Sequence, residues 1–108
     1  MDYINKVELQ GVTGAIRVTT VHDKRSVKFS LMTEELKKLH TGKVICETTW
    51  HAVTALDGEN IDDRIFSAQK NTKVKVTGRI RNTIYTDASG EEKIFTEVFA
   101  HEIKVLED

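Results

Sequence analysis

The sequence has no proline, one cysteine and one tryptophan among its 108 residues. Without proline, its turns depend on Gly, Asp, Asn and Ser, and long strands can run without interruption. A single cysteine excludes an intramolecular disulfide bond and a zinc cluster built on several thiolates, which is typical of a protein from a reducing compartment. We expect Cys46 to be a small buried residue in a strand rather than a reactive thiol.

Neither an excess of charge nor a long apolar run is present. The 16 Lys and Arg residues nearly balance the 17 Asp and Glu residues, which leaves a formal net charge of −1. Any attraction to a polyanion must therefore come from a local cluster of cations. No apolar stretch is long enough to span a membrane, and the N-terminus has no signal-peptide core, so we expect a soluble cytoplasmic protein. The length suits one domain, residues 1–108.

Alternating apolar and polar residues predict extended strands along most of the chain. The first runs from Tyr3 to Val21, and its Gly11 and Gly14 are typical of a bulge or of a bend at a barrel corner. A hairpin loop at His22–Arg25 leads into a second strand. Three apolar residues share one face of that strand: Val27, Phe29 and Leu31.

Two short segments have helical character. Thr33-Glu34-Glu35 resembles a helix start, so residues 33–40 are predicted to form a helical turn or a mobile loop that Gly42 ends. Further on, the spacing of Ile61, Ile65 and Phe66 predicts a short helix. Its cap is expected at Asn60 or Asp57.

Three more strands are predicted at Ile45–Leu56, Lys73–Thr86 and Lys93–Leu106, the last two joined by a hairpin at Asp87–Gly90. Five strands, with a bent first strand and a short helix between strands three and four, predict an all-β Greek-key barrel, the OB-fold. A β-sandwich usually has more strands and no helix, and a ferredoxin-like fold needs two long helices.

Trp50 is the most informative residue of the third strand. It shares a face with small and polar residues, namely Cys46, Thr48, Ala52 and Thr54, and with Leu56. A large ring in such surroundings is typical of a platform on which nucleobases stack, because every base has a π-face. The alternative is that Trp50 plugs one end of the barrel.

A stripe of cations follows the fourth strand. Period-two alternation places five side chains on one face: Lys73, Lys75, Arg79, Arg81 and Tyr85. Cations follow a phosphate backbone, while aromatic rings stack bases. Four further cations are predicted to extend this track: Arg17, Lys28, Lys37 and Lys38. The alternative is a solvated strand face that Lys and Arg keep soluble.

Motifs for catalysis or metal binding are absent from the sequence. Its four histidines are scattered, without the spacing of a metal site: His22, His40, His51 and His101. Glu47 and His51 share a strand face, but no nucleophile motif accompanies them. No glycine-rich phosphate loop is present. We therefore expect a binding protein with no metal and no cofactor, rather than an enzyme.

Five short motifs occur in the order and spacing of a known family. They are NKVELQG at 5–11, TTWHAV at 48–53, VKVTGRIR at 74–81, the hairpin Tyr85–Gly90, and Thr96-Glu97-Val98. With these motifs the chain resembles the bacterial single-stranded DNA-binding proteins across nearly its whole length. Each motif alone is weak, and their order is what makes the resemblance specific.

The resemblance implies an OB-fold, a homo-oligomer (a tetramer in preference to a dimer), and sequence-independent wrapping of single-stranded DNA. Such a protein works in replication, recombination or repair, or on a mobile element. Trp50 matches the family's stacking Trp, and Tyr85 stands where Trp is common. Leu56 replaces a Phe, and no aromatic residue lies near Lys37, where another Trp is frequent. His51 matches a position that the family uses at a subunit contact.

Typical members of this family continue into a flexible tail whose acidic tip recruits replication and repair enzymes. Because the sequence ends two residues after Leu106, we expect no recruitment of partners through such a tail. One alternative is the related primosomal replication protein, a restart accessory that binds DNA weakly and mainly contacts proteins. Another is an OB module for protein contacts alone. The NKV, TWH and GRIR motifs resemble the single-strand binders more closely.

Overall fold

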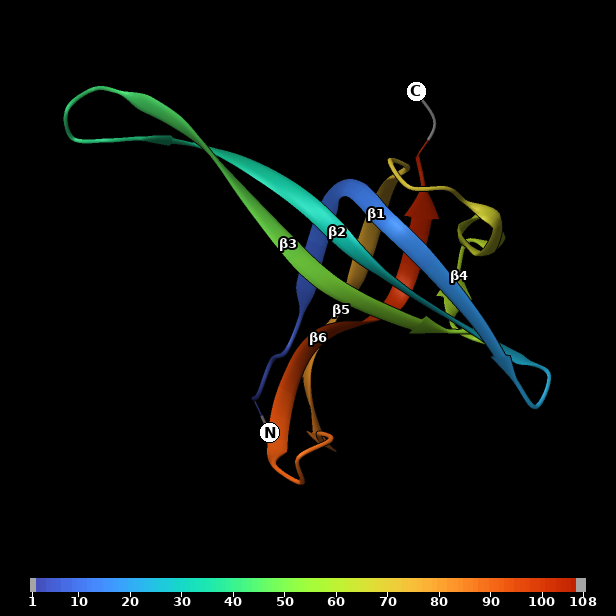
Figure 1. Cartoon of the computed structure of the whole chain (residues 1–108). Coiled ribbons are helices and arrows are strands. Elements are labelled where there is room, and N and C mark those ends of the chain that lie inside the picture. The colour runs from blue at the N-terminus through green and yellow to red at the C-terminus, as the bar shows by residue number, and fades with distance from the viewer. Residues whose placement is uncertain (1, 107–108) are drawn as a thin grey trace.

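The computed structural model describes residues 2–106, and Figure 1 shows two ribbons that project from a small barrel. The elements, in chain order, are β1 (Val7–Val21), β2 (Lys24–Lys38), β3 (Val44–Leu56), β4 (Asn60–Ile61), the 3-10 helix η1 (Asp63–Ser67), β5 (Lys73–Thr86) and β6 (Glu92–Val105). The expectation about recruitment through a tail concerns the chain after Leu106, where Glu107 and Asp108 lie outside the described residues.

Five of the strands close into a barrel. Antiparallel pairing joins β1 to both β2 and β5, β2 to β3, and β5 to β6. Parallel pairing of Val53 with Val98 and of Thr54 with Phe99 connects β3 to β6 and closes the barrel. β4 adds two residues beside β6. The predicted five-stranded OB-fold barrel is confirmed, and η1 takes the place of the predicted short helix between the third and fourth barrel strands.

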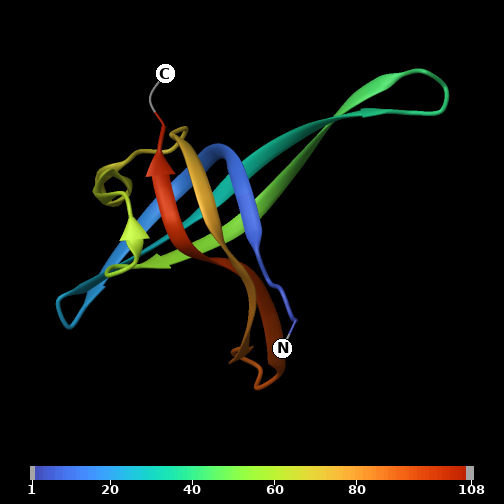
Figure 2. The ribbon, with the colours of Figure 1, turned by 180° about the vertical axis from the view of Figure 1, so that it is seen from behind.

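The barrel core follows from the alternation of side chains along the strands. Alternate residues of β2, β3 and β5 point inward and are buried: Val27, Phe29, Leu31, Val53, Ala55, Val74 and Val76. η1 contributes Ile65, which is fully buried in the same cluster. Figure 2 shows η1 on the side of the barrel away from the long β2–β3 ribbon.

β1 bends so that one strand serves two neighbours. Val7–Val12 pair with β5. From Val12 to Val21 the strand pairs with β2, with a register shift between Thr13 and Ile16. Gly11 lies at the crossing, where a Cβ would overlap the carbonyl oxygen of Met32. The predicted bend near the glycines of this strand is therefore confirmed. At Gly11 a glycine is needed because the backbones of β1 and β2 approach each other closely there.

β2 and β3 continue beyond the barrel as a two-stranded arm (Figure 1). Their pairing extends to Lys38 opposite Val44, and the turn is closed by the N–H of Gly42, which donates to the carbonyl of Leu39 at 2.9 Å. The prediction of a helical turn or loop over residues 33–40 was wrong. Backbone hydrogen bonds to β3 outweigh the helix preference of that segment's Glu, Leu and Lys residues.

Cys46 lies on this arm and is exposed, so the prediction that it is buried was wrong. Its thiol lies 3.6 Å from the Glu34 carboxylate. Partial desolvation, with the neighbouring Glu34 as a second cause, raises the pKa of the thiol. A raised pKa keeps the sulfur protonated, in agreement with the expectation that it is not a reactive thiol.

The β5–β6 hairpin is the second projection. Up to Val76 the alternate side chains of β5 are buried, and Gly78 packs directly against the backbone of Phe99 and Ala100. Beyond Gly78 the hairpin leaves the barrel, so Ile80 is 50% and Ile84 67% exposed. Ile80 and Ile84 alternate with polar residues as in a core strand, but no core covers this part of the hairpin.

Asp62 caps η1, rather than the predicted Asn60 or Asp57. Its carboxylate accepts from the backbone N–H of Arg64 at 3.1 Å and from that of Val105 at 3.0 Å. The cap therefore also ties the helix to the end of β6. The hydrogen bonds from the Arg64 side chain, followed by the one from the Val105 N–H, hold the pKa of Asp62 well below its ordinary value of 3.8.

Candidate nucleic-acid interface

A row of cross-strand neighbours crosses five strands on the outside of the barrel. Arg17 of β1 pairs with Lys28 of β2, and Lys28 pairs with Thr54 of β3. Thr54 then pairs with Phe99 of β6, which pairs with Arg79 of β5. Because directly opposed residues of a sheet point to the same side, this row brings together cations that are far apart in the sequence. We call Arg17, Lys28, Thr54, Phe99 and Arg79 the transverse row.

Trp50 lies on the same outer face as the transverse row, two alternations along β3 from Thr54. Its partner on β2 is Met32, and the side chain is 57% exposed. The ring edge lies against Gly14, where a Cβ would stand 3.3 Å from Cζ3 of Trp50. An exposed ring resting on the sheet is available to stack on a base, and the alternative of a barrel plug is excluded.

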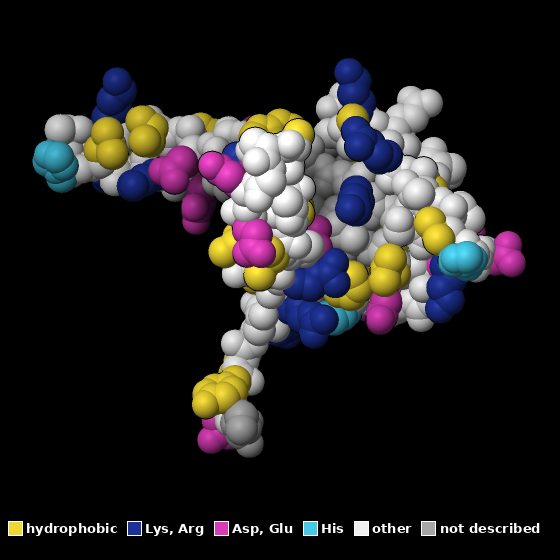
Figure 3. Space-filling view, turned by 60° about the horizontal axis from the view of Figure 1, so that its bottom comes forward, with side chains coloured by type: hydrophobic (Ala, Val, Ile, Leu, Met, Phe, Trp, Pro, Cys, Tyr) yellow, Lys and Arg dark blue, Asp and Glu magenta, His cyan; other side chains and the backbone are white. Residues whose placement is uncertain are grey.

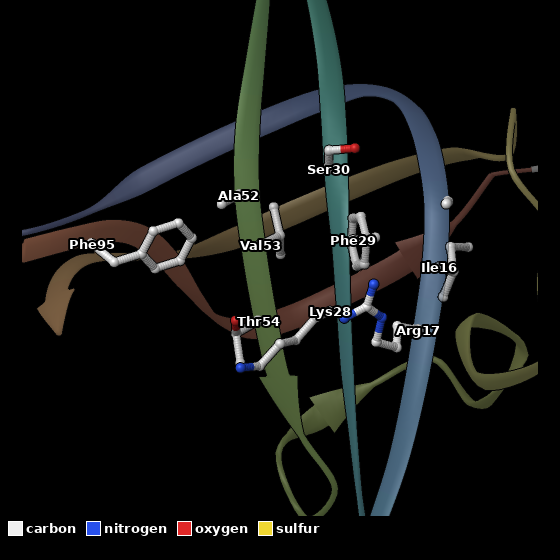
Figure 4. A pocket seen from close by; sticks show the side chains of 10 residues that line it. Ile16, Arg17, Lys28, Phe29, Ser30, Ala52, Val53, Thr54 and Phe95 are labelled. Carbon is white, nitrogen blue, oxygen red and sulfur yellow. The ribbon is translucent and has the colours of Figure 1, made fainter. Parts of the chain in front are cut away.

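A hollow of about 350 Å³ lies within this face and is drawn in Figure 4. Arg17, Lys28 and Thr54 place their polar groups near one end of it (Figure 4). Ala52 and Ser30 line it further along, and Phe95 reaches it from the other side of β3. Small side chains in the floor, with cations and an aromatic ring at the rim, make room for a base and its phosphate.

A buried carboxylate stands beside the row. Glu97 of β6 accepts hydrogen bonds from Nε and Nη2 of Arg81 at 3.1 and 2.6 Å, and from the hydroxyl of Thr54 at 2.7 Å. Desolvation raises the pKa of Glu97, but the hydrogen bonds from Arg81 and Thr54 and the nearby charge of Lys28 outweigh it and leave the pKa lowered. Glu97 is therefore ionised at neutral pH.

The sequence analysis missed two aromatic residues of this face, Phe95 and Phe99. Phe95 pairs with Thr83, and it therefore shares a face of the β5–β6 hairpin with Tyr85. The two rings are each 46% exposed. The hairpin turn at 87–90 was predicted, and counting back from it along both strands would have placed Phe95 on the face of Tyr85 and Arg81.

Lys73 and Lys75 are separated from the other predicted cations. Lys75 is flanked by Gln10 of β1 and Lys104 of β6, on the barrel part of β5. The next outward position, Thr77, is flanked by Glu8 and Glu102. A row with two carboxylates therefore lies between these lysines and Arg79, so the stripe predicted from β5 alone is interrupted in space.

Lys37 and His51 lie on the opposite face of the arm from Trp50. Lys37 is in an ion pair with Glu47 at 3.7 Å, and Nε2 of His51 lies 2.9 Å from the hydroxyl of Thr33. Alternation places Lys38, not Lys37, on the face of Trp50. His51 lines a groove of about 320 Å³ with acidic side chains around it: Glu8, Glu34, Glu35 and Glu47.

Figure 3 shows how the charged side chains are distributed over one face of the molecule. Lys and Arg side chains (dark blue) gather in several separate groups, with Asp and Glu (magenta) between them (Figure 3). The arm, at the upper left, carries basic and hydrophobic side chains near its tip and acidic ones nearer the barrel (Figure 3). Leu36, 77% exposed, belongs to the same arm. The positive charge is thus local, as the near-zero net charge requires.

Within residues 2–106, no group of three His, Cys, Asp or Glu side chains is placed to hold a metal ion. Over the same residues, no helix has the length and apolar character needed to cross a membrane.

Comparison with known proteins decides the family. The model of the single-strand binding protein family matches residues 4–106. The chain belongs to this family. Among solved structures, a Plasmodium falciparum SSB in complex with ssDNA has a TM-score of 0.83 at 24% sequence identity, covering 99% of this chain and 98% of that one.

A second similar structure comes from Thermus aquaticus. It is a deletion mutant of the single-stranded DNA binding protein, with a TM-score of 0.80 and 20% identity. The match covers 96% of this chain and 51% of that one, so this chain spans about half its length. At such identities the two structures establish the same fold, and the family model carries the assignment to the SSB family.

Proposed function

We propose that this SSB-family protein binds single-stranded DNA without sequence preference, on the face that carries Trp50 and the transverse row. The observation that carries this proposal is the register of five strands, which lines up Arg17, Lys28 and Arg79 beside an exposed Trp50. Cations spaced across a sheet follow a phosphate backbone, and exposed rings stack bases of any identity. The P. falciparum relative was solved with ssDNA, which supports the same ligand.

The groups on this face favour binding over catalysis and single strands over duplex. Trp50, Tyr85 and Phe95 are each about half exposed. Rings of this kind gain contact area only from unpaired bases that can be splayed out. The transverse row supplies charges, and the rest of this face supplies exposed rings, rather than a set of donors and acceptors matched to base edges, in agreement with recognition that tolerates any sequence.

Trp50 fluorescence provides the test, because this tryptophan is the only one in the sequence. We expect oligo-dT to quench the emission saturably, and a duplex of the same length to quench it much less at equal salt. Saturable binding by an independent method without any change in emission would move the site away from Trp50. Absence of binding to oligo-dT at low salt would contradict the proposed function itself.

We propose further that the protein acts as a homo-oligomer, a tetramer in preference to a dimer, in replication, recombination or repair. The resemblance of His51 to a subunit-contact position supports this, as does the open groove in which His51 lies. An oligomer brings several binding faces to one strand and raises its affinity without any new contact within a subunit.

A further inference from the structure

Arg81 is the one predicted DNA-binding cation whose charge is already matched by a buried carboxylate within the described residues. Nε and Nη2 of Arg81 both donate to Oε1 of Glu97, and Oε2 of Glu97 accepts from Thr54. The side chain of Glu97 is 5% exposed and that of Arg81 38%. The pair is therefore half-buried and neutral as a unit, with its guanidinium fixed in position by two hydrogen bonds.

The guanidinium of Arg81 also covers an aromatic ring. Its Cζ lies over the ring of Phe99 at 4.1 Å from the centroid. Phe99 is part of the transverse row on the outside of the barrel, yet it is only 8% exposed. Arg81, with Arg79 at 5.6 Å from the same ring, therefore contributes to shielding Phe99 from water.

Arg79 offers a natural comparison. It lies two residues away on the same strand, faces the same ring and is exposed, but no ion pair to it occurs among the described residues. Its charge is available to a phosphate. That of Arg81 is not, because a phosphate that approached Arg81 would also meet the adjacent carboxylate of Glu97.

From these contacts we infer that Arg81 binds a nucleobase by stacking on it rather than a phosphate by charge, and that Glu97 is the positioning residue that holds the guanidinium against Phe99. This inference rests on the proposed function, since it assigns a role within the same face. A planar guanidinium stacks on flat rings, and one that is held in place loses little conformational freedom on binding. Phe99, Arg81 and a base would form three layers, with Trp50, Phe95 and Tyr85 as further stacking surfaces.

The test uses variants that separate charge from planarity. Arg81→Lys keeps the charge and a partner for Glu97 but removes the plane. The double variant Arg81→Gln with Glu97→Gln removes both charges together, leaves no buried unpaired carboxylate and keeps the net charge. Arg79→Gln is the matched control, in which the same strand face carries one cation fewer. Affinities are measured over a range of salt, for oligo-dT and for an abasic strand of equal length.

We expect Arg81→Lys to weaken binding to oligo-dT about 5-fold to 20-fold, the lower part of the range for one stacked base. On the abasic strand the same variant should bind like the native protein, because the stacking partner is missing. For the double variant, the slope of log K against log salt should equal the native slope. For Arg79→Gln it should shrink by about 0.7, the value for one phosphate contact on a single strand.

Two results would overturn the inference. One is native affinity for oligo-dT in a folded Arg81→Lys protein. The other is a slope reduced by about 0.7 in the double variant, which would show that Arg81 neutralises a phosphate. In both cases the native protein still binds and Trp50 is still quenched, so the proposed function would stand. If the native protein itself did not bind, the proposed function would fail instead.

Discussion

The ring edge of Trp50 lies against Gly14 so closely that a methyl group at this position would press on the ring. A Cβ at Gly14 would stand 3.3 Å from Cζ3 of Trp50 and 2.5 Å from the hydroxyl of Ser30. The hydroxyl can rotate away, whereas the ring can give only by shifting. The site of Trp50 therefore depends on a glycine in the neighbouring strand as well as on its own strand.

We expect Gly14→Ala to displace the ring and to weaken binding to oligo-dT by a fraction of the roughly 1–3 kcal/mol that one stacked base contributes. Fluorescence titration measures the affinity, and the emission maximum of Trp50 reports the displacement. The double variant with Ser30→Ala removes the clash with the hydroxyl but not the one with the ring. This double variant should show the same loss of affinity for oligo-dT. Native affinity in the double variant would show that the contact with Ser30, not the one with Trp50, causes the loss.

Replacing Trp50 itself should separate binding from folding. Because the side chain is 57% exposed, Trp50→Ala should leave the thermal unfolding midpoint nearly unchanged. Binding to oligo-dT should weaken by about 1–3 kcal/mol. Tyr3→Ala is the control: it also removes an exposed ring, at 87% exposure, from the segment before β1, and should bind normally. Equal affinity of the two variants would remove Trp50 from the site.

The barrel was predictable because the strands alternate strictly wherever one face is buried. Val27, Phe29 and Leu31 mark β2 as a core strand, and all three are buried. The arm was not predictable in the same way, since beyond Met32 neither face of β2 is covered by a core. Its segment with two glutamates, a leucine and two lysines has the composition of a helix, and only the ladder to β3 makes it a strand.

Asp62 is expected to stabilise the end of the barrel. Asp62→Ala removes the acceptor for the N–H groups of Arg64 and Val105, and it should lower the free energy of unfolding by about 1–2 kcal/mol, the usual cost of losing a helix cap. Urea denaturation at neutral pH measures the difference. An unchanged midpoint would show that water replaces both hydrogen bonds.

The same residue predicts a pH dependence. The pKa of Asp62 is lower in the folded protein than its ordinary value of 3.8, so the ionised carboxylate stabilises the fold fully above that pH. The contribution is lost as the pH falls below 3.8 toward the folded-state pKa. The stability difference between the native protein and Asp62→Asn, measured by urea denaturation, should therefore shrink on acidification in that window. A difference that does not vary with pH would show that the ionised Asp62 carboxylate does not stabilise the fold.

The proposed oligomer should be visible in sedimentation at micromolar concentration as a tetramer. His51→Glu should favour smaller species, because it adds a carboxylate to a groove already lined by Glu8, Glu35 and Glu47. Lys38→Ala, which alternation places on the opposite face of the arm, serves as the control. A native chain that sediments as a monomer would contradict the proposed assembly and favour the alternative of a module for protein contacts.

The site was predictable in its residue types but not in its boundaries. Trp50, Arg79 and Tyr85 were found from alternation within single strands. Which cations join them is decided by register between strands, and the sequence does not show that Lys28 stands opposite both Arg17 and Thr54. Nor does it show that Glu8 and Glu102 interrupt the stripe between Lys75 and Arg79, because they come from β1 and β6.

The central claim, that single-stranded DNA crosses the transverse row, is tested most directly by two matched double variants. Arg17→Gln with Lys28→Gln removes one cross-strand pair of cations from the row, and Lys75→Gln with Lys104→Gln removes another such pair outside it. We predict that the first flattens the slope of log K against log salt by about 0.7 for each phosphate that is no longer neutralised, and that the second leaves it unchanged. Flattening by the second pair alone would place the DNA on the other side of the barrel and contradict the account.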